Sequence, residues 1–288
     1  MSHYMVMVIK RKGSDKGVDE LLAPYDENLE VPQYVRKTKP ELIKSMAALV
    51  ERVKRSAALN AELGGKEDAY NEKVDTLDLR DYVSWRYLGC AEAQRLEKVD
   101  PTDEDAVFEE VKKEYEGNLN VDGDYVSNYN PNSKWDWYET GGRFCGELIL
   151  KRRSSFHVDE AKAGEIDWDA MFSIDPEEEK ELSEFWDEYV MGGIPEKEYY
   201  EKHHFVLYKR EYFLERYKTK EEYIRQSGLW TPYAVLDDEG WHAAGDMGWF
   251  GCSSETDEEA NSWADGFRRR FVDTLDPEDE VTIVDCHI

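Results

Sequence analysis

The hydrophobic pattern of the chain begins with an almost continuous apolar run, YMVMVIK, at residues 4–10. Runs of this kind are typical of strands in the middle of a sheet, because both faces of such a strand are covered. The segment EVTIVDCHI at 280–288 has the same character. We therefore expect two strands from opposite ends of the chain to lie in one sheet.

A helical period follows the first strand and a proline-containing loop. Apolar residues recur at helical intervals at Leu42, Met46, Leu49, Val53 and Leu59. Pro40 lies near the first turn, so Thr38 is expected to cap a long amphipathic helix that ends by Gly64 and Gly65.

Two more helices are expected in the same region, at 79–96 and after Thr102. Thr102 begins a capping-box pattern in which Asp105 is the closing acid. A strand is expected at 143–151, where RFCGELILK alternates its side chains.

The last 60 residues predict a hairpin and a helix before the closing strand. DDEG at 237–240 is a turn between two short apolar stretches. Residues 256–275 begin with acidic residues and carry basic residues near their end, as the helix dipole favours.

These elements predict an α+β fold, with a small antiparallel or mixed sheet built from both chain termini and with helical insertions. Residues 1–154 are expected to form the first part of the α+β core, with a helical insertion at about 38–117. Residues 155–227 are expected to form a largely helical insertion or arm, and 228–288 the second part of the core.

Charge narrows the classes of partner. The chain carries 37 basic and 65 acidic residues, a net charge of -28. Such a chain repels nucleic acid, although KRRSS at 151–155 and FRRRF at 267–271 are short basic runs. An acidic surface favours basic partners, such as the nucleic-acid-binding clefts of other proteins. Solubility alone is the alternative explanation of the charge.

Compartment and chemistry are constrained by what the sequence lacks. Charged residues interrupt every apolar stretch before it reaches the ~20 residues of a membrane span. The four cysteines form no CxxC pair, which favours a reducing compartment and therefore the cytoplasm. The motifs GxxxxGK[ST], GxGxxG, HExxH and GxSxG do not occur, and this lowers the expectation of an enzyme without abolishing it.

The segment KWDWYETGGRF at 134–144 is the most unusual stretch of the chain. If WDWY is extended, Trp135 and Trp137 face one way, whereas Asp136 and Tyr138 face the other. The two glycines that follow permit a sharp reversal. After the reversal, Arg143 is expected to return toward Asp136 or Glu139.

Two interpretations of this segment remain. The indoles form either a stacking shelf beside an Arg143 anion clamp or a packed corner with one internal ion pair, and the packed corner is favoured because aromatic rings usually contribute core area. Residues 186–193, WDEYVMGG, repeat part of the pattern but lack the arginine. We interpret this echo as chance or as a recurring way to end an element with Gly-Gly, rather than as a duplicated active site.

A polar group near the C-terminus offers the ligand types of a transition-metal site: His242, Asp246, Cys252, Asp285, Cys286 and His287. Its spacing matches no metal pattern, so we expect no metal and no cofactor. His242, Cys252, Cys286 and His287 are the weak metal candidates. In a strand, Cys286 points away from both neighbours, so a catalytic pair would have to use His242 or His3.

Several motifs together resemble a family of proteins encoded by tailed phages and prophages. They are MSHYMVMVI, LLAPYDENLEV, NPNSKWDWYETGGRF, DMGWFG and VDCHI. The resemblance implies a small accessory protein made during infection, of the sort that blocks bacterial immunity. In size and organisation the chain is also similar to the Gabija anti-defence protein, an oligomeric inhibitor that coats its target complex.

We therefore expect a non-enzymatic inhibitor in the host cytoplasm that binds a host defence protein or complex. One form of this expectation is that it covers the target's nucleic-acid-binding surface. We expect it to form a homo-oligomer and to bind neither nucleic acid nor membrane. Tyrosine and tryptophan are favoured at interfaces, so the expected binding residues are Trp135, Asp136, Trp137, Tyr138, Arg143 and Trp249. The alternatives are an enzyme acting on a nucleotide or immune signal molecule, with His242 or His287 as acid or base, and a virion or assembly protein.

Overall fold

The computed structural model describes residues 2–77, 81–195 and 208–288. The chain divides into two compact units. One comprises Met1–Leu29 and Asn130–Ile288, and the other, Glu30–Tyr129, is inserted between these two parts.

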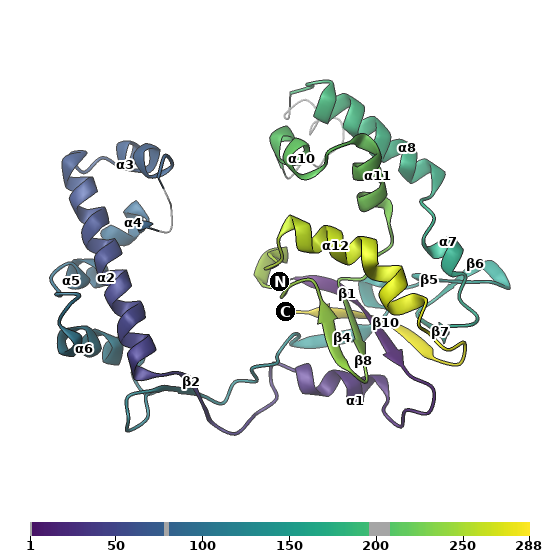
Figure 1. Cartoon of the computed structure of the whole chain (residues 1–288), viewed down its shortest axis with the longest axis horizontal. Coiled ribbons are helices and arrows are strands. Elements are labelled where there is room, and N and C mark those ends of the chain that lie inside the picture. Colours follow the sequence, from purple (N-terminus) through teal and green to yellow (C-terminus); the bar gives the residue numbers. More distant parts are fainter. Residues whose placement is uncertain (1, 78–80, 196–207) are drawn as a thin grey trace. The chain divides into compact units, whose positions relative to one another are not determined.

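The first unit is built on a mixed sheet of six strands (Figure 1). Its strand order is β4-β10-β1-β8-β9, and β7 also pairs with β10. β1 is antiparallel to β10 and parallel to β8. The expected α+β fold, with a sheet made from both ends of the chain, is confirmed. The strands are β1 (His3–Lys10), β4 (Trp137–Thr140), β7 (Glu160–Lys162), β8 (Ala234–Asp237), β9 (Gly240–Ala243) and β10 (Glu280–His287).

Both faces of this sheet are covered, which explains the apolar runs at its two central strands. On one face, Met7 and Ile283 pack with Phe267 of α12 (Asp257–Phe267) and Phe271 of η6 (Arg268–Val272). The opposite face packs against α1 (Val18–Leu22). The 3-10 turn η1 (Ala23–Tyr25) follows α1 directly along the chain. Figure 1 shows α12 and α1 on opposite sides of the strands.

The local signals near the C-terminus are confirmed. β8 and β9 form the expected hairpin, with Asp237 paired to Gly240. α12 begins directly after Thr256, whose N–H and hydroxyl both donate to Glu259 Oε2 at 2.8 Å. A 3-10 turn, η5 (Trp249–Gly251), lies between the hairpin and α12.

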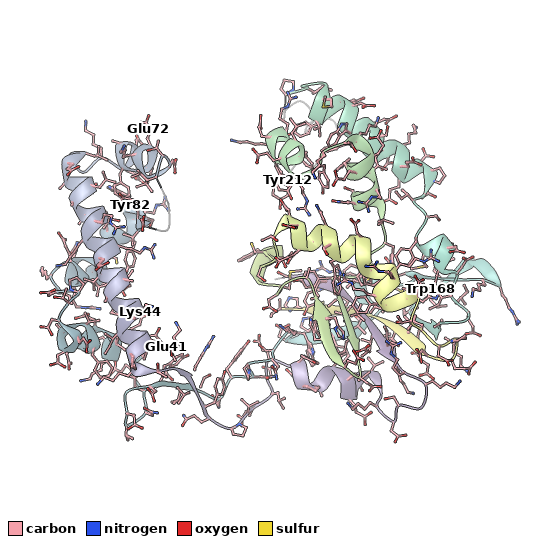
Figure 2. The ribbon with its side chains drawn as sticks, in the orientation of Figure 1. Glu41, Lys44, Glu72, Tyr82, Trp168 and Tyr212 are labelled. Carbon is pink, nitrogen blue, oxygen red and sulfur yellow. The ribbon has the colours of Figure 1, made fainter. Side chains whose placement is uncertain are left out.

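The strand expected at 143–151 is much shorter than predicted. Gly142–Phe144 form a 3-10 turn, η3, and only Leu148–Leu150 form a strand, β5. Gly146, with a φ of +78°, lies between them and interrupts the extended chain. β5 pairs with β6 (Arg153–Val158). After β7 comes α7 (Trp168–Met171), which begins at Trp168 (Figure 2), and the ring centroids of Trp168 and Trp230 are 6.3 Å apart.

A helical segment follows α7 within the same unit. It contains α8 (Pro176–Phe185), the π-helical turn η4 (Trp186–Met191), α10 (Arg210–Arg216) and α11 (Lys220–Gly228). An aromatic cluster holds these helices together, with Phe185, Trp186, Tyr189 and Tyr223 at its centre. The WDEYVM part of the sequence echo therefore ends a helix inside a core, a different setting from the strand at Trp137–Thr140.

The second unit is a helical bundle beside a two-stranded ribbon. The ribbon is β2 (Tyr34–Lys37) and β3 (Tyr125–Ser127). The helices are α2 (Lys39–Glu62), α3 (Glu67–Val74), α4 (Trp85–Leu88), α5 (Ala91–Leu96) and α6 (Glu104–Glu114). The cap at Thr38 is confirmed, since its N–H and hydroxyl both donate to Glu41 Oε2 at 2.8 Å.

Two helix predictions in this unit are wrong in detail. The capping residue of α6 is Asp103 rather than Thr102, because the Asp103 carboxylate accepts the Ala106 N–H at 3.1 Å. The helix expected at 79–96 is two short helices, because Gly89 and Cys90 end α4 and start α5. Residues 79 and 80 of that prediction lie outside the described residues.

Candidate functional site

Strand register brings three aromatic side chains into one row at the end of the sheet. His3 of β1 is paired with His287 of β10, and His287 is paired with Trp137 of β4. Residues at directly opposed positions share a face of the sheet. Trp137 of the segment at 134–144 and His287 of the C-terminal polar group therefore lie together with His3. We call these three residues, with Asp136 and Asp285, the histidine constellation.

The first imidazole is fixed by a buried carboxylate. His3 Nδ1 lies 3.0 Å from Oδ1 and 3.1 Å from Oδ2 of Asp285. Asp285 is only 1% exposed. Its Oδ2 also accepts the backbone N–H of Arg143 at 3.0 Å. The carboxylate is thus hydrogen-bonded from two sides, as a buried charged group requires.

The glycine pair makes room for this carboxylate. Gly141 and Gly142 have φ values of +70° and +52°, so the expected reversal is confirmed. A Cβ atom on Gly142 would lie 2.5 Å from the Cβ of Asp285. Gly142 is therefore needed both for its backbone conformation and for the close approach of Asp285.

The second imidazole is fixed by a different carboxylate. His287 Nδ1 lies 2.5 Å from Asp136 Oδ1, and the Asp136 N–H donates to the His287 carbonyl at 2.9 Å. The His287 side chain is 6% exposed. Asp136 therefore fixes the ring through its side chain and the end of β10 through its backbone.

The three rings are in mutual contact. The centroids of His3 and His287 are 4.9 Å apart at an interplanar angle of 71°. Trp137 stacks on His287 at 5.4 Å and 20°, and meets His3 edge to face at 5.5 Å. Trp137 is nevertheless 42% exposed, so its indole still offers surface to solvent.

The expected alternation of the WDWY side chains is wrong. Trp135 is 7% exposed and belongs to the core on the α1 side of the sheet, where its Nε1 donates to the Leu22 carbonyl at 3.2 Å. Tyr138 meets Trp135 edge to face at 4.9 Å. The reason is that β4 begins only at Trp137, so the alternation of an extended strand does not reach back to Trp135.

The ion pair expected for Arg143 is also absent from the part of the chain that the structure describes. Arg143 is exposed, and its backbone N–H, rather than its guanidinium, contacts the site. Neither the shelf of two indoles nor the packed corner describes the segment as a whole. Trp135 and Tyr138 are core residues, whereas Asp136 and Trp137 belong to the histidine constellation.

The polar group predicted near the C-terminus does not converge as a whole. His242 Nε2 lies 3.1 Å from Asp237 Oδ1, away from the row of three rings. Cys286 faces the α1 side, as expected from strand alternation, and burial raises the pKa of its thiol. Cys252 is exposed, and the side chain of Trp249 lies outside the described residues. Within residues 2–77, 81–195 and 208–288, no three His, Cys, Asp or Glu side chains are grouped as metal ligands.

Burial also sets the ionisation of the tyrosine beside this segment. Burial and the hydrogen bond from its hydroxyl to Asp19 Oδ1, at 2.6 Å, raise the pKa of Tyr138 to about 12. Its phenol therefore remains protonated at neutral pH. Tyr138 thus contributes packing and one hydrogen bond to α1.

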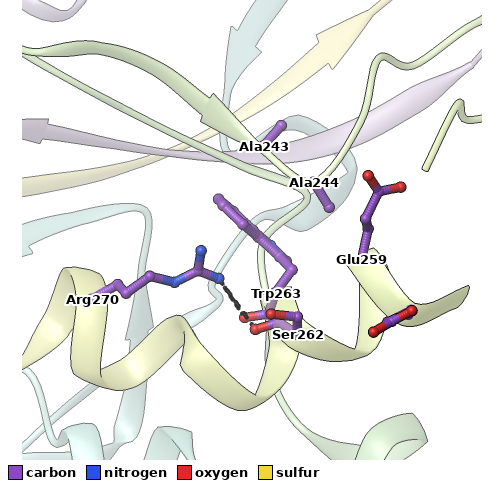
Figure 3. A pocket seen from close by; sticks show the side chains of 7 residues that line it. Ala243, Ala244, Glu259, Ser262, Trp263 and Arg270 are labelled. Carbon is purple, nitrogen blue, oxygen red and sulfur yellow. Dashed lines mark hydrogen bonds between the residues drawn. The ribbon is translucent and has the colours of Figure 1, made fainter. Parts of the chain in front are cut away.

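A surface hollow of about 370 Å³ lies elsewhere in this unit (Figure 3). Figure 3 shows Trp263 projecting from α12 toward Ala243 and Ala244, with Arg270 on one side and Glu259 on the other. Arg270 Nη2 donates to the Trp263 carbonyl at 3.1 Å, and its guanidinium lies 4.8 Å from the Trp263 ring centroid. We interpret these contacts as capping of the junction between α12 and η6.

Sequence reasoning missed the partnership of His3 with Asp285 and of His287 with Asp136. A signal was present in the two end strands. If they pair antiparallel with their ends aligned, the third residue of the chain faces residue 287. Their alternation then places Asp285 on the same face as both histidines.

Comparison with protein-family models, with curated protein sequences and with solved structures gives no significant match. Among the described residues, no helix is long and apolar enough to cross a membrane.

Proposed function

We propose that this chain is an acidic binding protein that inhibits a bacterial defence complex during phage infection. In this proposal it acts in the host cytoplasm as a homo-oligomer, binds neither nucleic acid nor membrane, and covers a basic, nucleic-acid-binding surface of its target. The resemblance of its motifs to a phage accessory family supplies the biological context. The net charge of -28 supplies the physical basis.

The observation that carries this proposal is a row of exposed glutamates on α8. Leu182 and Phe185 pack into the aromatic cluster of the helical segment. Glu178, Glu181 and Glu184 are exposed on the same helix, and no ion pair is found for them among the described residues. Spaced three residues apart, these carboxylates form a strip that runs obliquely along the helix.

A strip of unpaired carboxylates favours a partner that carries lysine or arginine. Charges on a surface of one sign steer an oppositely charged partner and raise the association rate. A nucleic-acid-binding cleft presents such basic residues in order to neutralise phosphates. An acidic face that occupies the cleft competes with the nucleic acid for the same side chains.

The experiment is a plating assay in bacteria that each carry one defence system. We expect expression of the chain to restore plating of a restricted phage in the strain whose system is the target. The triple variant E178Q/E181Q/E184Q should lose at least about tenfold of this rescue, because interfacial charges govern association.

The matched control removes the same number of charges elsewhere. E51Q/E62Q/E72Q changes three exposed glutamates of the second unit, one of which is Glu72 on α3 (Figure 2). This variant should retain rescue. Equal loss in both triple variants would show that total charge, rather than α8, matters, and absence of rescue in every strain would overturn the proposal.

A further inference from the structure

The histidine constellation has a property that packing does not explain. His3 and His287 each use Nδ1 for a carboxylate. Neither Nε2 has a hydrogen-bond partner in the described ranges, and neither is a fully buried atom without a partner. Each Nε2 therefore keeps some accessible surface, with side chains that are 13% exposed for His3 and 6% exposed for His287.

We propose that His3 and His287 form an acid–base pair that cleaves a small ribonucleotide phosphodiester. A carboxylate on Nδ1 fixes the orientation of an imidazole and leaves Nε2 to accept or donate a proton. One such ring is common in catalytic sites. Here two rings with this arrangement lie with their centroids 4.9 Å apart.

The alternative use of two carboxylate-bound imidazoles is metal coordination, in which such carboxylates form a second shell. A catalytic metal site takes three protein ligands. No third ligand accompanies these two histidines among the described residues. Proton transfer requires only the two groups that are present.

The neighbouring side chains favour a nucleotide as the substrate. The exposed part of the Trp137 indole can stack on a base, since base stacking on aromatic side chains is tolerant of base identity. Arg143 has an exposed guanidinium without an ion pair in the described part of the chain. Its backbone N–H contacts Asp285, so a flexible cation is anchored beside the pair and can contact a phosphate.

The charge of the chain limits the size of the substrate. At a net charge of -28, a long polyanion is repelled over the whole surface. A dinucleotide brings only one internal phosphodiester to one place. We therefore infer a dinucleotide, rather than long RNA, as the substrate class.

The reaction needs no co-reactant. The neutral imidazole takes the proton of the ribose 2′-hydroxyl through Nε2, and the 2′-oxygen forms a bond to phosphorus. The bond from phosphorus to the 5′-oxygen of the next nucleotide breaks, and the protonated imidazole gives its proton to that oxygen. The products are a 2′,3′-cyclic phosphate and a 5′-hydroxyl, and the proton has moved from one ring to the other.

The test uses the whole chain and the ribodinucleotide ApA, with products separated by chromatography. We expect adenosine and adenosine 2′,3′-cyclic phosphate, with a bell-shaped dependence of the rate on pH and no effect of EDTA. The deoxy analogue d(ApA) should remain intact because it has no 2′-hydroxyl. Cleavage of d(ApA), loss of activity in EDTA, or no cyclic product from ApA would overturn the proposal.

The decisive variants are His3→Asn and His287→Asn. An asparagine amide can still donate to Asp285 or Asp136 but has no counterpart of Nε2. Each variant should lose at least about 100-fold in rate, the usual contribution of a positioned acid or base. His242→Asn, which alters a histidine paired with Asp237, should retain the rate of the unchanged protein.

Thermal unfolding of each variant shows whether it is folded. If His3→Asn does not fold, His287→Asn alone decides the outcome, since the loss of either proton carrier is sufficient. Unchanged cleavage in a folded variant would contradict the proposal. Cleavage is measured without a partner, so this result does not depend on rescue of phage plating.

Discussion

His3 and His287 occupy directly paired positions on β1 and β10, with ring centroids 4.9 Å apart, although they lie 284 positions apart along the chain. His3 is hydrogen-bonded through Nδ1 to the carboxylate of Asp285, and His287 is hydrogen-bonded through Nδ1 to that of Asp136. Each Nε2 lacks a hydrogen-bond partner in the described ranges, and Trp137 stacks on His287 at this end of the sheet.

Replacement of Gly142 by alanine should destabilise the unit. The residue has a φ of +52°, and a Cβ there would lie 2.5 Å from the Cβ of Asp285. We expect a loss of about 1–3 kcal/mol in the free energy of unfolding, measured by chemical denaturation.

Gly13→Ala is the matched control for Gly142→Ala. Gly13 has a φ of +81°, but nothing lies within 4 Å of a Cβ placed there. The control variant therefore measures the cost of a positive φ alone, without the steric clash with Asp285 that occurs at position 142. Equal losses in the two variants would show that Asp285 does not constrain the residue at 142.

Asp237→Asn should destabilise the protein at neutral pH and much less in acid. Burial alone would raise the pKa of Asp237, but hydrogen bonds from His242, from the Glu239 N–H and from Arg11 outweigh it and hold the pKa below its usual value. A depressed carboxyl pKa contributes stability above the pKa of the unfolded chain, and this contribution disappears as the pH falls through the folded pKa.

The measurement for Asp237→Asn is chemical denaturation at several pH values. At pH 7 we expect the variant to lose about 2 kcal/mol, as for a hydrogen bond to a charged group. The difference should shrink below about pH 4, where the carboxyl of the unfolded chain protonates. Asp238→Asn changes an exposed neighbour and should show little difference at any pH. A difference for Asp237→Asn that stays constant into acid would contradict this assignment.

The cysteines should differ in their reaction with a thiol reagent. The charge of Asp159, 3.6 Å from its sulfur, raises the pKa of the exposed Cys145, and burial raises that of Cys286. Since the thiolate is the reactive form, Cys286 should react only on unfolding, and Cys145 more slowly than the exposed Cys252.

Asp159→Asn provides the check on the Cys145 assignment, because it removes the charge but keeps a side chain of the same size. It should accelerate labelling of Cys145 at pH 8 and leave Cys252 unchanged, as mass spectrometry of labelled peptides can show. Labelling of Cys286 at the rate of Cys252 in the native protein would be inconsistent with its burial.

Binding of the chain to its partner should weaken strongly with salt. Raising the salt from about 50 mM to about 500 mM shortens the range of charge interactions and should reduce the affinity at least about tenfold, as isothermal titration calorimetry can measure. The E178Q/E181Q/E184Q variant should show a shallower salt dependence than E51Q/E62Q/E72Q. Affinity that does not change with salt would exclude the electrostatic form of the proposed function.

The features predicted correctly from the sequence are those that depend on short stretches of neighbouring residues. The caps at Thr38 and Thr256, the hairpin at 237–240 and the buried strands at both ends are present. The caps and the hairpin turn are stabilised by contacts between residues a few positions apart, so a short sequence pattern is enough to predict them.

The parts that failed depend on long-range pairing. The orientation of Trp135 could not be read from alternation, because β4 begins at Trp137 and the chain before it follows its bridge to Asp26. The partners of His3 and His287 depend on register across the whole chain and on the loop that carries Asp136. No local pattern contains that information.

The position of β10 between β1 and β4 has a consequence for biosynthesis. β1 is made first, but its antiparallel neighbour, Glu280–His287, is made after all the other strands. Until the ribosome has released this stretch, no strand joins β1 to β4, and the apolar residues on both sheet faces lack the contacts that β10 makes. Translation that stops before residue 280 should therefore yield a product that chaperones retain and proteases remove.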